Sequence, residues 1–207
     1  MKYNTINITL NNSKLGGFIP SLDLPPVITC RKNAPCIKYC YARHGAFTYP
    51  SKIQSMQANL DAYKNNANAF FNDIISFLNN RDIAFRFWRW FGSGDIVNAE
   101  FLTGCVRVAN ECPQTRFLMF TKKFELVNEF IKNGGIIPSN LHIVFSGWDK
   151  DFHIDNPFNL PCAYVELKDK TKCANIPELA IPCEGSCATC KACWSLQNQQ
   201  CVYFKQH

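Results

Sequence analysis

Strand-like and helix-like segments alternate through the middle of this 207-residue chain. Residues 84–91, 115–120 and 141–146 have the apolar composition of buried strands, whereas residues 97–111 and 123–132 have helical character. Strands that alternate with helices of about ten residues favour parallel β/α units. The pattern predicts an α/β fold whose core occupies residues 1–155.

The flanking segments are predicted from the same kinds of pattern. Residues 2–10 alternate as a half-buried strand, and the apolar segment 26–29 is interpreted as a short strand. Two helices are expected from apolar residues three and four positions apart: Ile53, Met56, Leu60 and Tyr63, then Phe70, Ile74, Phe77 and Leu78. Four prolines after Trp148 predict a loop-rich C-terminal tail, residues 156–207, with short strands at 163–167 and 201–205.

Three cysteines lie within eleven residues directly after the apolar segment 26–29. They are Cys30, Cys36 and Cys40. Thiolates are the usual ligands of iron–sulfur clusters, and three of them leave one iron open to a small molecule. The loop therefore predicts an open [4Fe–4S] cluster, with a zinc loop completed by a distant ligand as the alternative.

A second cysteine group lies in the tail. Its members are Cys183, Cys187, Cys190 and Cys193. The spacing of the last three resembles that of ferredoxin loops, so we expect a closed, auxiliary [4Fe–4S] cluster here, with zinc as the alternative metal. Cys105 and Cys112 are expected to be buried apolar residues, and Cys162, Cys173 and Cys201 receive no role, although Cys173 or Cys201 is the first candidate for a spare ligand.

Composition limits the expected location of the protein, the state of its cysteines and its partners. The first ten residues have no signal-peptide pattern, and no run of about 18 apolar residues predicts a membrane span, so we expect a cytoplasmic protein. The 12 cysteines are then expected to hold metal rather than to form disulfides. The formal charge of +6 omits any metal-bound thiolates and forms no basic tail, so it gives nucleic acid no support as a partner.

Each predicted β/α strand ends in a small polar cluster. These clusters are Gly92-Ser93-Gly94-Asp95, Thr121-Lys122-Lys123 and Ser146-Gly147-Trp148-Asp149. Ligands of parallel β/α proteins bind beyond the carboxyl ends of the strands, so the clusters are expected to share one rim with the first cysteine loop. The alternative is structural: Ser93 and Asp95 would cap the following helix, and Asp149 would turn a loop.

Arg89 alternates with phenylalanines on strand 84–91, so its charge is expected on an apolar face, where it needs a partner. That partner is either a carboxylate of a bound ligand, or Asp95 or Glu100. His142 and His153 have no metal-ligand spacing and are expected to be structural.

Four motifs occur together in this chain: Leu24-Pro25-Pro26-Val27-Ile28-Thr29-Cys30, Cys36-x3-Cys40-Tyr41-Ala42-Arg43, Phe91-Gly92-Ser93-Gly94-Asp95-Ile96 and the terminal Cys-x2-Cys-x2-Cys-Trp. In combination they resemble the phage-associated "gene product 88" family, which itself resembles radical S-adenosylmethionine proteins. The resemblance implies a small or incomplete parallel (β/α) barrel. It also implies that the open cluster binds S-adenosylmethionine and, when reduced, cleaves it to a 5′-deoxyadenosyl radical. Residues Gly92–Asp95 match the glycine-rich motif that holds the methionine amine in that superfamily.

Two departures from that superfamily are visible. The first loop is Cys-x5-Cys-x3-Cys instead of Cys-x3-Cys-x2-Cys, and about four β/α units stand where six are usual. Cys183, Cys187 and Cys190 have the superfamily spacing, but Cys193 would close that site and too little chain follows it for a barrel.

The sequence thus predicts a radical S-adenosylmethionine-like redox enzyme. It would bind a small-molecule cofactor in the rim formed by Arg89, Gly92, Ser93, Gly94, Asp95, Thr121, Lys122, Ser146 and Asp149, and take electrons from a reductase or other electron donor. The alternative is a non-catalytic nucleic-acid-binding protein with structural metals, in which Arg86, Trp88 and Trp90 form a cationic and aromatic surface.

Overall fold

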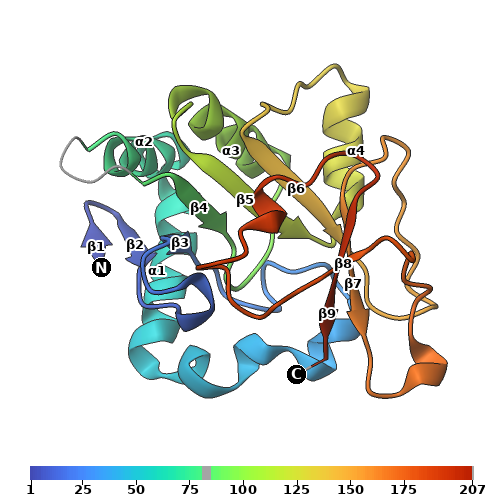
Figure 1. Cartoon of the computed structure of the whole chain (residues 1–207). Coiled ribbons are helices and arrows are strands. Elements are labelled where there is room, and N and C mark those ends of the chain that lie inside the picture. The colour runs from blue at the N-terminus through green and yellow to red at the C-terminus, as the bar shows by residue number, and fades with distance from the viewer. Residues whose placement is uncertain (81–84, 207) are drawn as a thin grey trace.

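The computed structural model describes residues 1–80 and 85–206, in which the strands form one mixed sheet (Figure 1). Its order is β1-β2-β3-β4-β5-β6-β7-β9-β8. The strands are β1 (Lys2–Tyr3), β2 (Ile6–Thr9), β3 (Ser21–Leu22), β4 (Phe87–Trp90), β5 (Arg116–Thr121), β6 (Leu141–Ser146), β7 (Cys162–Glu166), β8 (Ile181–Pro182) and β9 (Cys201–Lys205). Pairing is antiparallel from β1 to β3 and parallel from β3 to β8.

The helices cover one face of the sheet. They are α1 (Pro50–Asn65), α2 (Ala67–Leu78), α3 (Ala99–Glu111) and α4 (Phe124–Lys132). Because β3 to β7 follow one another in chain order and crossovers are right-handed, successive helices are placed on the same side. The main core forms there: Trp88 and Trp90 of β4 pack with Phe70 of α2 and Phe101 of α3.

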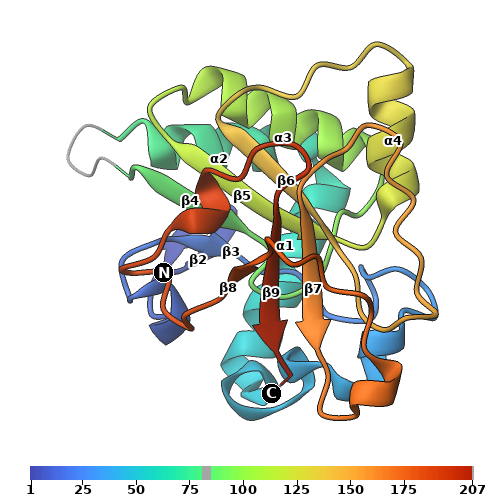
Figure 2. The same ribbon diagram turned by 45° about the vertical axis from the view of Figure 1, so that its right-hand side comes forward.

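The C-terminal tail lies across the opposite face (Figures 1 and 2). A second, smaller core forms there, where Leu118 and Val144 from the strands pack with Trp194 and Val202 from the tail and Leu15 from the N-terminal loop. The sheet therefore has no bare face along β5 and β6. Strands β7, β8 and β9 also continue the sheet beyond residue 155, so core and tail share one sheet.

The helix predictions are confirmed. The helices expected from Ile53 to Leu78 are α1 and α2, and those expected at 97–111 and 123–132 are α3 and α4. Ile53 is the exception to the expected core, because it is 50% exposed. No helix of the described residues is long and apolar enough to cross a membrane.

The strand predictions are confirmed in the middle of the chain and need correction near its start. Strand 141–146 is β6, and the strand expected at 84–91 is shorter, since β4 spans Phe87–Trp90 and residue 84 lies outside the described residues. Segment 26–29 is a turn, because prolines at 25 and 26 lack the amide that a strand needs and Val27 adopts a positive φ of 68°. The strand preceding the cysteine loop is instead β3. Segment 2–10 is divided by a turn at Asn4 into β1 and β2.

A cysteine-lined cavity as the candidate metal centre

Both cysteine groups line the same cavity of about 500 Å³. The cavity opens at the carboxyl ends of the parallel strands and extends over the sheet face that the tail covers. Seven cysteines contribute to its wall: Cys30, Cys36, Cys40, Cys183, Cys187, Cys190 and Cys193. Each of them is half-buried, whereas Cys105, Cys112 and Cys162 are buried elsewhere.

The first cysteine loop is folded by short turns. Cys36 lies in a 3-10 helix, Pro35–Tyr39, and Cys40 caps its C-terminal end. Burial is the main cause that raises the pKa of the Cys30 thiol to about 11, and the nearby charges of Asp95, Cys36 and Cys40 contribute to the rise. Cys36 and Cys40 are therefore close enough to oppose the ionisation of Cys30, which a bound cation would relieve.

The tail loop is anchored to both ends of the chain. Cys183 donates its backbone N–H to Tyr203 O at 2.9 Å, and Cys187 donates to Lys14 O at 2.8 Å. The loop ends in a 3-10 helix, Ala192–Trp194, whose buried Trp194 donates from Nε1 to Trp88 O at 3.1 Å. Packing of this indole fixes the four tail thiols against the sheet.

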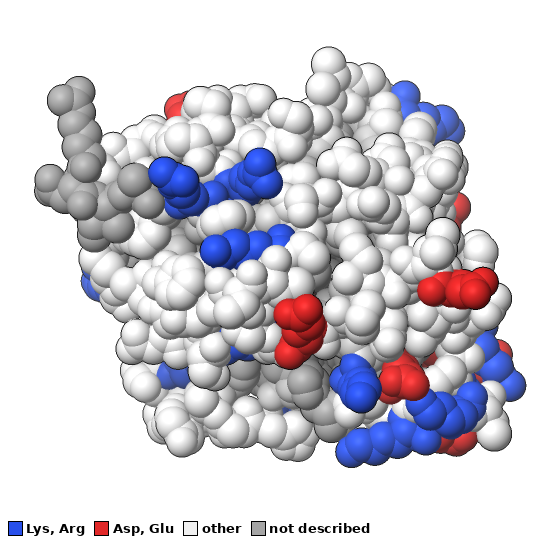
Figure 3. Space-filling view, viewed as in Figure 1, with Lys and Arg blue, Asp and Glu red and all other residues white. Residues whose placement is uncertain are grey.

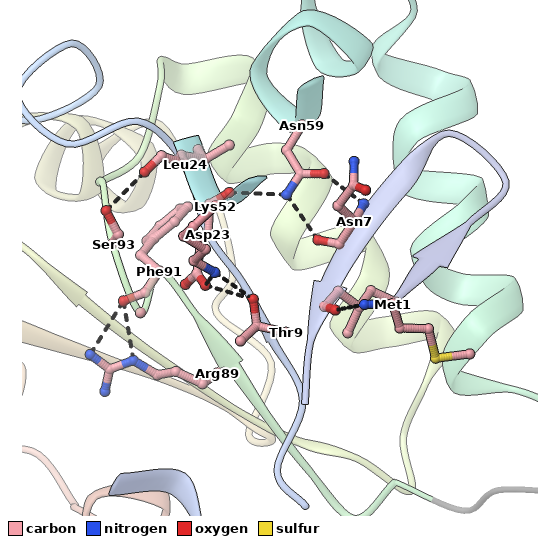
Figure 4. A network of polar contacts seen from close by, with 12 residues as sticks. Met1, Asn7, Thr9, Asp23, Leu24, Lys52, Asn59, Arg89, Phe91 and Ser93 are labelled. Carbon is pink, nitrogen blue, oxygen red and sulfur yellow. Dashed lines mark hydrogen bonds and ion pairs between the residues drawn. The ribbon is translucent and has the colours of Figure 1, made fainter. Parts of the chain in front are cut away.

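Arg89 lines the cavity beside the tail cysteine group. Its guanidinium is 4.2 Å from the centre of the Phe120 ring, and its Nε and Nη2 lie 3.4 and 3.5 Å from Phe91 O (Figure 4). Its charge favours ionisation of Cys187 and Cys193, although burial dominates and raises the pKa of Cys193 to about 12. No ion pair among the described residues includes Arg89, so the expected pairing with Asp95 or Glu100 is absent there.

The glycine-rich segment lines the cavity, but Gly92, Ser93 and Gly94 pack against residues 23–29, which lead into the first cysteine loop. A Cβ added at Gly94, whose φ is +87°, would lie 2.8 Å from Leu24 Cβ and 2.9 Å from Leu24 O. Ser93 donates from Oγ to Leu24 O at 3.0 Å. A Cβ at Gly92 would lie 2.5 Å from Oδ1 of Asp23, whose other carboxylate oxygen accepts from Thr9 and Lys52 (Figure 4).

Asp95 joins the ends of β4 and β5. Its carboxylate accepts hydrogen bonds from Thr121 Oγ1 at 2.6 Å, Lys122 N at 2.9 Å and Ile96 N at 2.7 Å. Burial raises the pKa of this carboxyl, and those hydrogen bonds act in the opposite direction. Asp95 is thus already a well-satisfied acceptor within the protein.

The structure tests the two structural roles considered for the strand ends, a helix cap at Ser93 or Asp95 and a turn at Asp149. Helix α3 is capped by Asn98, whose side chain accepts from Phe101 N, so neither Ser93 nor Asp95 is its cap. Asp149 accepts from Asp151 N at 3.2 Å within a turn and pairs with Cys173, and it does not line the cavity. The other rim residues, Arg89, Gly92, Ser93, Gly94, Asp95, Thr121, Lys122 and Ser146, all do.

Lys122 connects the second strand end with the third. Its Nζ donates to Ser146 Oγ at 2.7 Å, and its charge lowers the pKa of Cys36, which burial raises overall. A cation and a hydroxyl thus lie together on the cavity wall, and the cation is near Cys36.

Three cavity residues beside the first cysteine group were assigned no site role from the sequence, although Tyr41 belongs to one of the family motifs. Tyr39 stacks on Trp148, with ring centres 5.9 Å apart and planes 18° apart, and Tyr41 donates to Gly92 O at 2.6 Å. Arg31 donates to Lys122 O at 2.9 Å and lies over the Phe124 ring. Their position beside Cys30 and Cys40 in the sequence was the available clue.

The cationic and aromatic surface considered for nucleic acid is not formed as expected. Trp88 and Trp90 are both 0% exposed, beneath the helices, so they offer no ring to a base. His142 has a structural position, because its Nδ1 lies 3.3 Å from Leu196 O.

The remaining thiols lie outside the cavity wall. Cys105 and Cys112 are buried in the main core, as predicted. Cys162 and Cys201 are paired neighbours on β7 and β9, and Cys173 Sγ accepts from Leu167 N at 3.0 Å. In the described part of the chain, no three His, Cys, Asp or Glu side chains are arranged to hold a single metal ion. A cubane cluster spreads its ligands over several irons, so that arrangement is not the one it requires.

Comparison with known proteins gives one match. No curated protein and no solved structure matches the chain. The family model described as Gene product 88 matches residues 2–196, which is nearly the whole length. The chain therefore belongs to the Gene product 88 family.

Proposed function

We propose that this protein is an iron–sulfur redox enzyme of the radical S-adenosylmethionine type. Cys30, Cys36 and Cys40 would hold an open [4Fe–4S] cluster, and Cys183, Cys187, Cys190 and Cys193 an auxiliary one. The observation that carries the proposal is that these seven thiols, from opposite ends of the chain, line one cavity.

The number of thiols in each cysteine group fits the cluster that is proposed for it. Three thiols provide an open coordination position and four provide a closed site, which is the difference between reactive and structural metal centres. The raised pKa values of Cys30 and Cys193 mean that metal must displace protons from these thiols. When bound, the open cluster would supply electrons to a sulfonium cofactor. Zinc is the alternative in the tail, because four thiolates also make a closed zinc site.

The fold supports the type of enzyme. Parallel strands β3 to β7 in chain order, with helices on one face only, are the arrangement of an incomplete β/α barrel, and the cavity lies on the inner face that such a sheet would have.

The cofactor contacts of this chain are proposed to differ from the superfamily pattern. Asp95 already accepts three hydrogen bonds, and the space beside Gly92 and Gly94 is filled by residues 23–29. We assign the cofactor's carboxylate to Arg89 and Lys122, which line the cavity as cations near the thiols.

The test measures iron, acid-labile sulfide and zinc in anaerobically purified protein. Two cubane clusters predict about eight irons per chain, falling by about half in Cys36→Ala and in Cys187→Ala. Cys105→Ala is the matched control, because this thiol is buried in α3 away from the cavity. Release of 5′-deoxyadenosine from the cofactor after reduction would then establish the reaction, and zinc without sulfide would refute the proposal.

A further inference from the structure

A patch of three cationic residues lies on the outer surface beside the tail cysteine loop. Arg86 precedes β4, Arg116 begins β5 and Lys191 lies between Cys190 and Cys193. Together with Phe85, Phe87 and Gln114 they line a shallow pocket, and no acidic residue of the described parts of the chain, 1–80 and 85–206, lines it. Figure 3 shows blue cationic side chains gathered on this face, which we call the basic patch.

Lys191 connects the basic patch to the cavity. It lines both, and it adopts a positive φ of 54°, which is uncommon for a residue with a side chain. Its Nζ lies 5.3 Å from the centre of the Phe87 ring. The basic patch is therefore the outer side of the same loop whose inner side carries Cys190 and Cys193.

We propose that the basic patch is the docking surface of a small acidic electron-transfer protein that reduces the tail cluster. This inference rests on the proposed function, which requires an electron donor. In each transfer the donor loses one electron and the tail cluster gains it, and no bond is made or broken. Electron-transfer partners typically meet through small interfaces steered by complementary charge.

The aromatic residues of the basic patch favour an acidic protein over a nucleic acid. One face of Phe85 is stacked on Phe77, with ring centres 4.9 Å apart. Phe87 is contacted by Lys191, which lies over its ring, and by Trp194, whose ring plane is nearly perpendicular to it. Bases need open aromatic faces on which to stack, and these rings are already engaged.

The test compares two double variants with equal changes in charge. Arg86→Glu with Arg116→Glu reverses the basic patch, and both residues are exposed. Lys150→Glu with Lys168→Glu is the control, because both lysines are exposed and line neither the cavity nor the basic patch. The probe is reduced flavodoxin, an acidic flavin protein. Its oxidation is followed by rapid mixing with the cluster-loaded protein, and its binding in the oxidised form by calorimetry.

We expect the patch variant to be reduced about tenfold more slowly than the wild type, to bind flavodoxin more weakly and to lose salt dependence, since steering by charge is removed. Reduction by dithionite, a small reductant, should be unchanged. The inference is overturned if the control variant loses as much of its reduction rate and flavodoxin binding as the patch variant. It is also overturned if the patch variant is reduced by flavodoxin at the wild-type rate. It is likewise overturned if the reversal abolishes binding of a single-stranded oligonucleotide while leaving flavodoxin binding intact. A chain without iron and sulfide refutes the proposed function as well, whereas a loaded chain with patch-independent reduction refutes only the docking surface.

Discussion

At the scale of single residues, Gly94 is a position where the cysteine approach packs closely against the segment that follows β4. Its φ of +87° and its contact with Leu24 leave no space for a side chain. Overpacking and a left-handed backbone together predict that Gly94→Ala lowers the free energy of unfolding by about 2–5 kcal/mol. Urea denaturation measures this loss. Gly134→Ala is the control, since Gly134 shares the positive φ but has open space around it, so a loss of equal size there would assign the effect to backbone strain alone.

Arg89 provides a second prediction at this scale. Its charge lies near Cys187 and Cys193, where it stabilises negative charge. Arg89→Met should therefore lower the reduction potential of the tail cluster, because reduction adds negative charge that the methionine cannot offset. A redox titration followed by electron paramagnetic resonance measures this potential. An unchanged potential with full iron content would remove the electrostatic role assigned to Arg89.

At the scale of elements, β6 holds the tail through His142. A carbonyl only accepts, so His142 Nδ1 carries the proton that it donates to Leu196 O. Burial is the main cause that lowers the pKa of His142, the charge of Arg116 adds to it, and the hydrogen bond to Leu196 opposes it. The folded imidazole thus resists a proton that the unfolded chain accepts.

The lowered pKa of His142 determines how the stability of the protein changes with pH. Stability is full above the ordinary histidine pKa of about 6.5 and falls as the pH drops below it, because the unfolded state then binds more protons. His142→Gln keeps a donor but cannot take a proton, so its unfolding midpoint in urea should vary less between about pH 5 and pH 7 than that of the wild type. Equal pH dependence in the two proteins would contradict this assignment.

The elements also show what local sequence can predict. Helices α1 to α4 were predictable because their apolar periodicity lies within each segment. Strands β3 and β8 are only two residues long and carry no pattern of their own, since their existence depends on the strands beside them. Segment 26–29 was wrongly predicted as a strand because its apolar composition concealed a turn enforced by two prolines.

At the scale of the whole molecule, the candidate site is made by segments from both ends of the chain. The sequence predicted that the first cysteine loop and the strand ends share a rim, and its three thiols and every strand-end residue except Lys123, Gly147 and Asp149 line the cavity. It did not predict that the tail cysteines join them. That placement depends on β7 and β9 extending the sheet, which returns the tail across the face occupied by Leu118 and Val144.

The same arrangement predicts that the core does not fold alone. A chain ending after Asp155 would expose Leu118, Val144 and the adjoining rings of Phe87 and Phe120, which the tail covers. An apolar sheet face of this kind should bind a hydrophobic dye and lose the cooperative thermal transition, because a large exposed apolar patch favours loose packing and association. A chain ending after Lys205 retains β9 and is the control. If the fragment 1–155 unfolds cooperatively and leaves the dye unbound, the tail is an independent appendage and the two cysteine groups need no common fold to function.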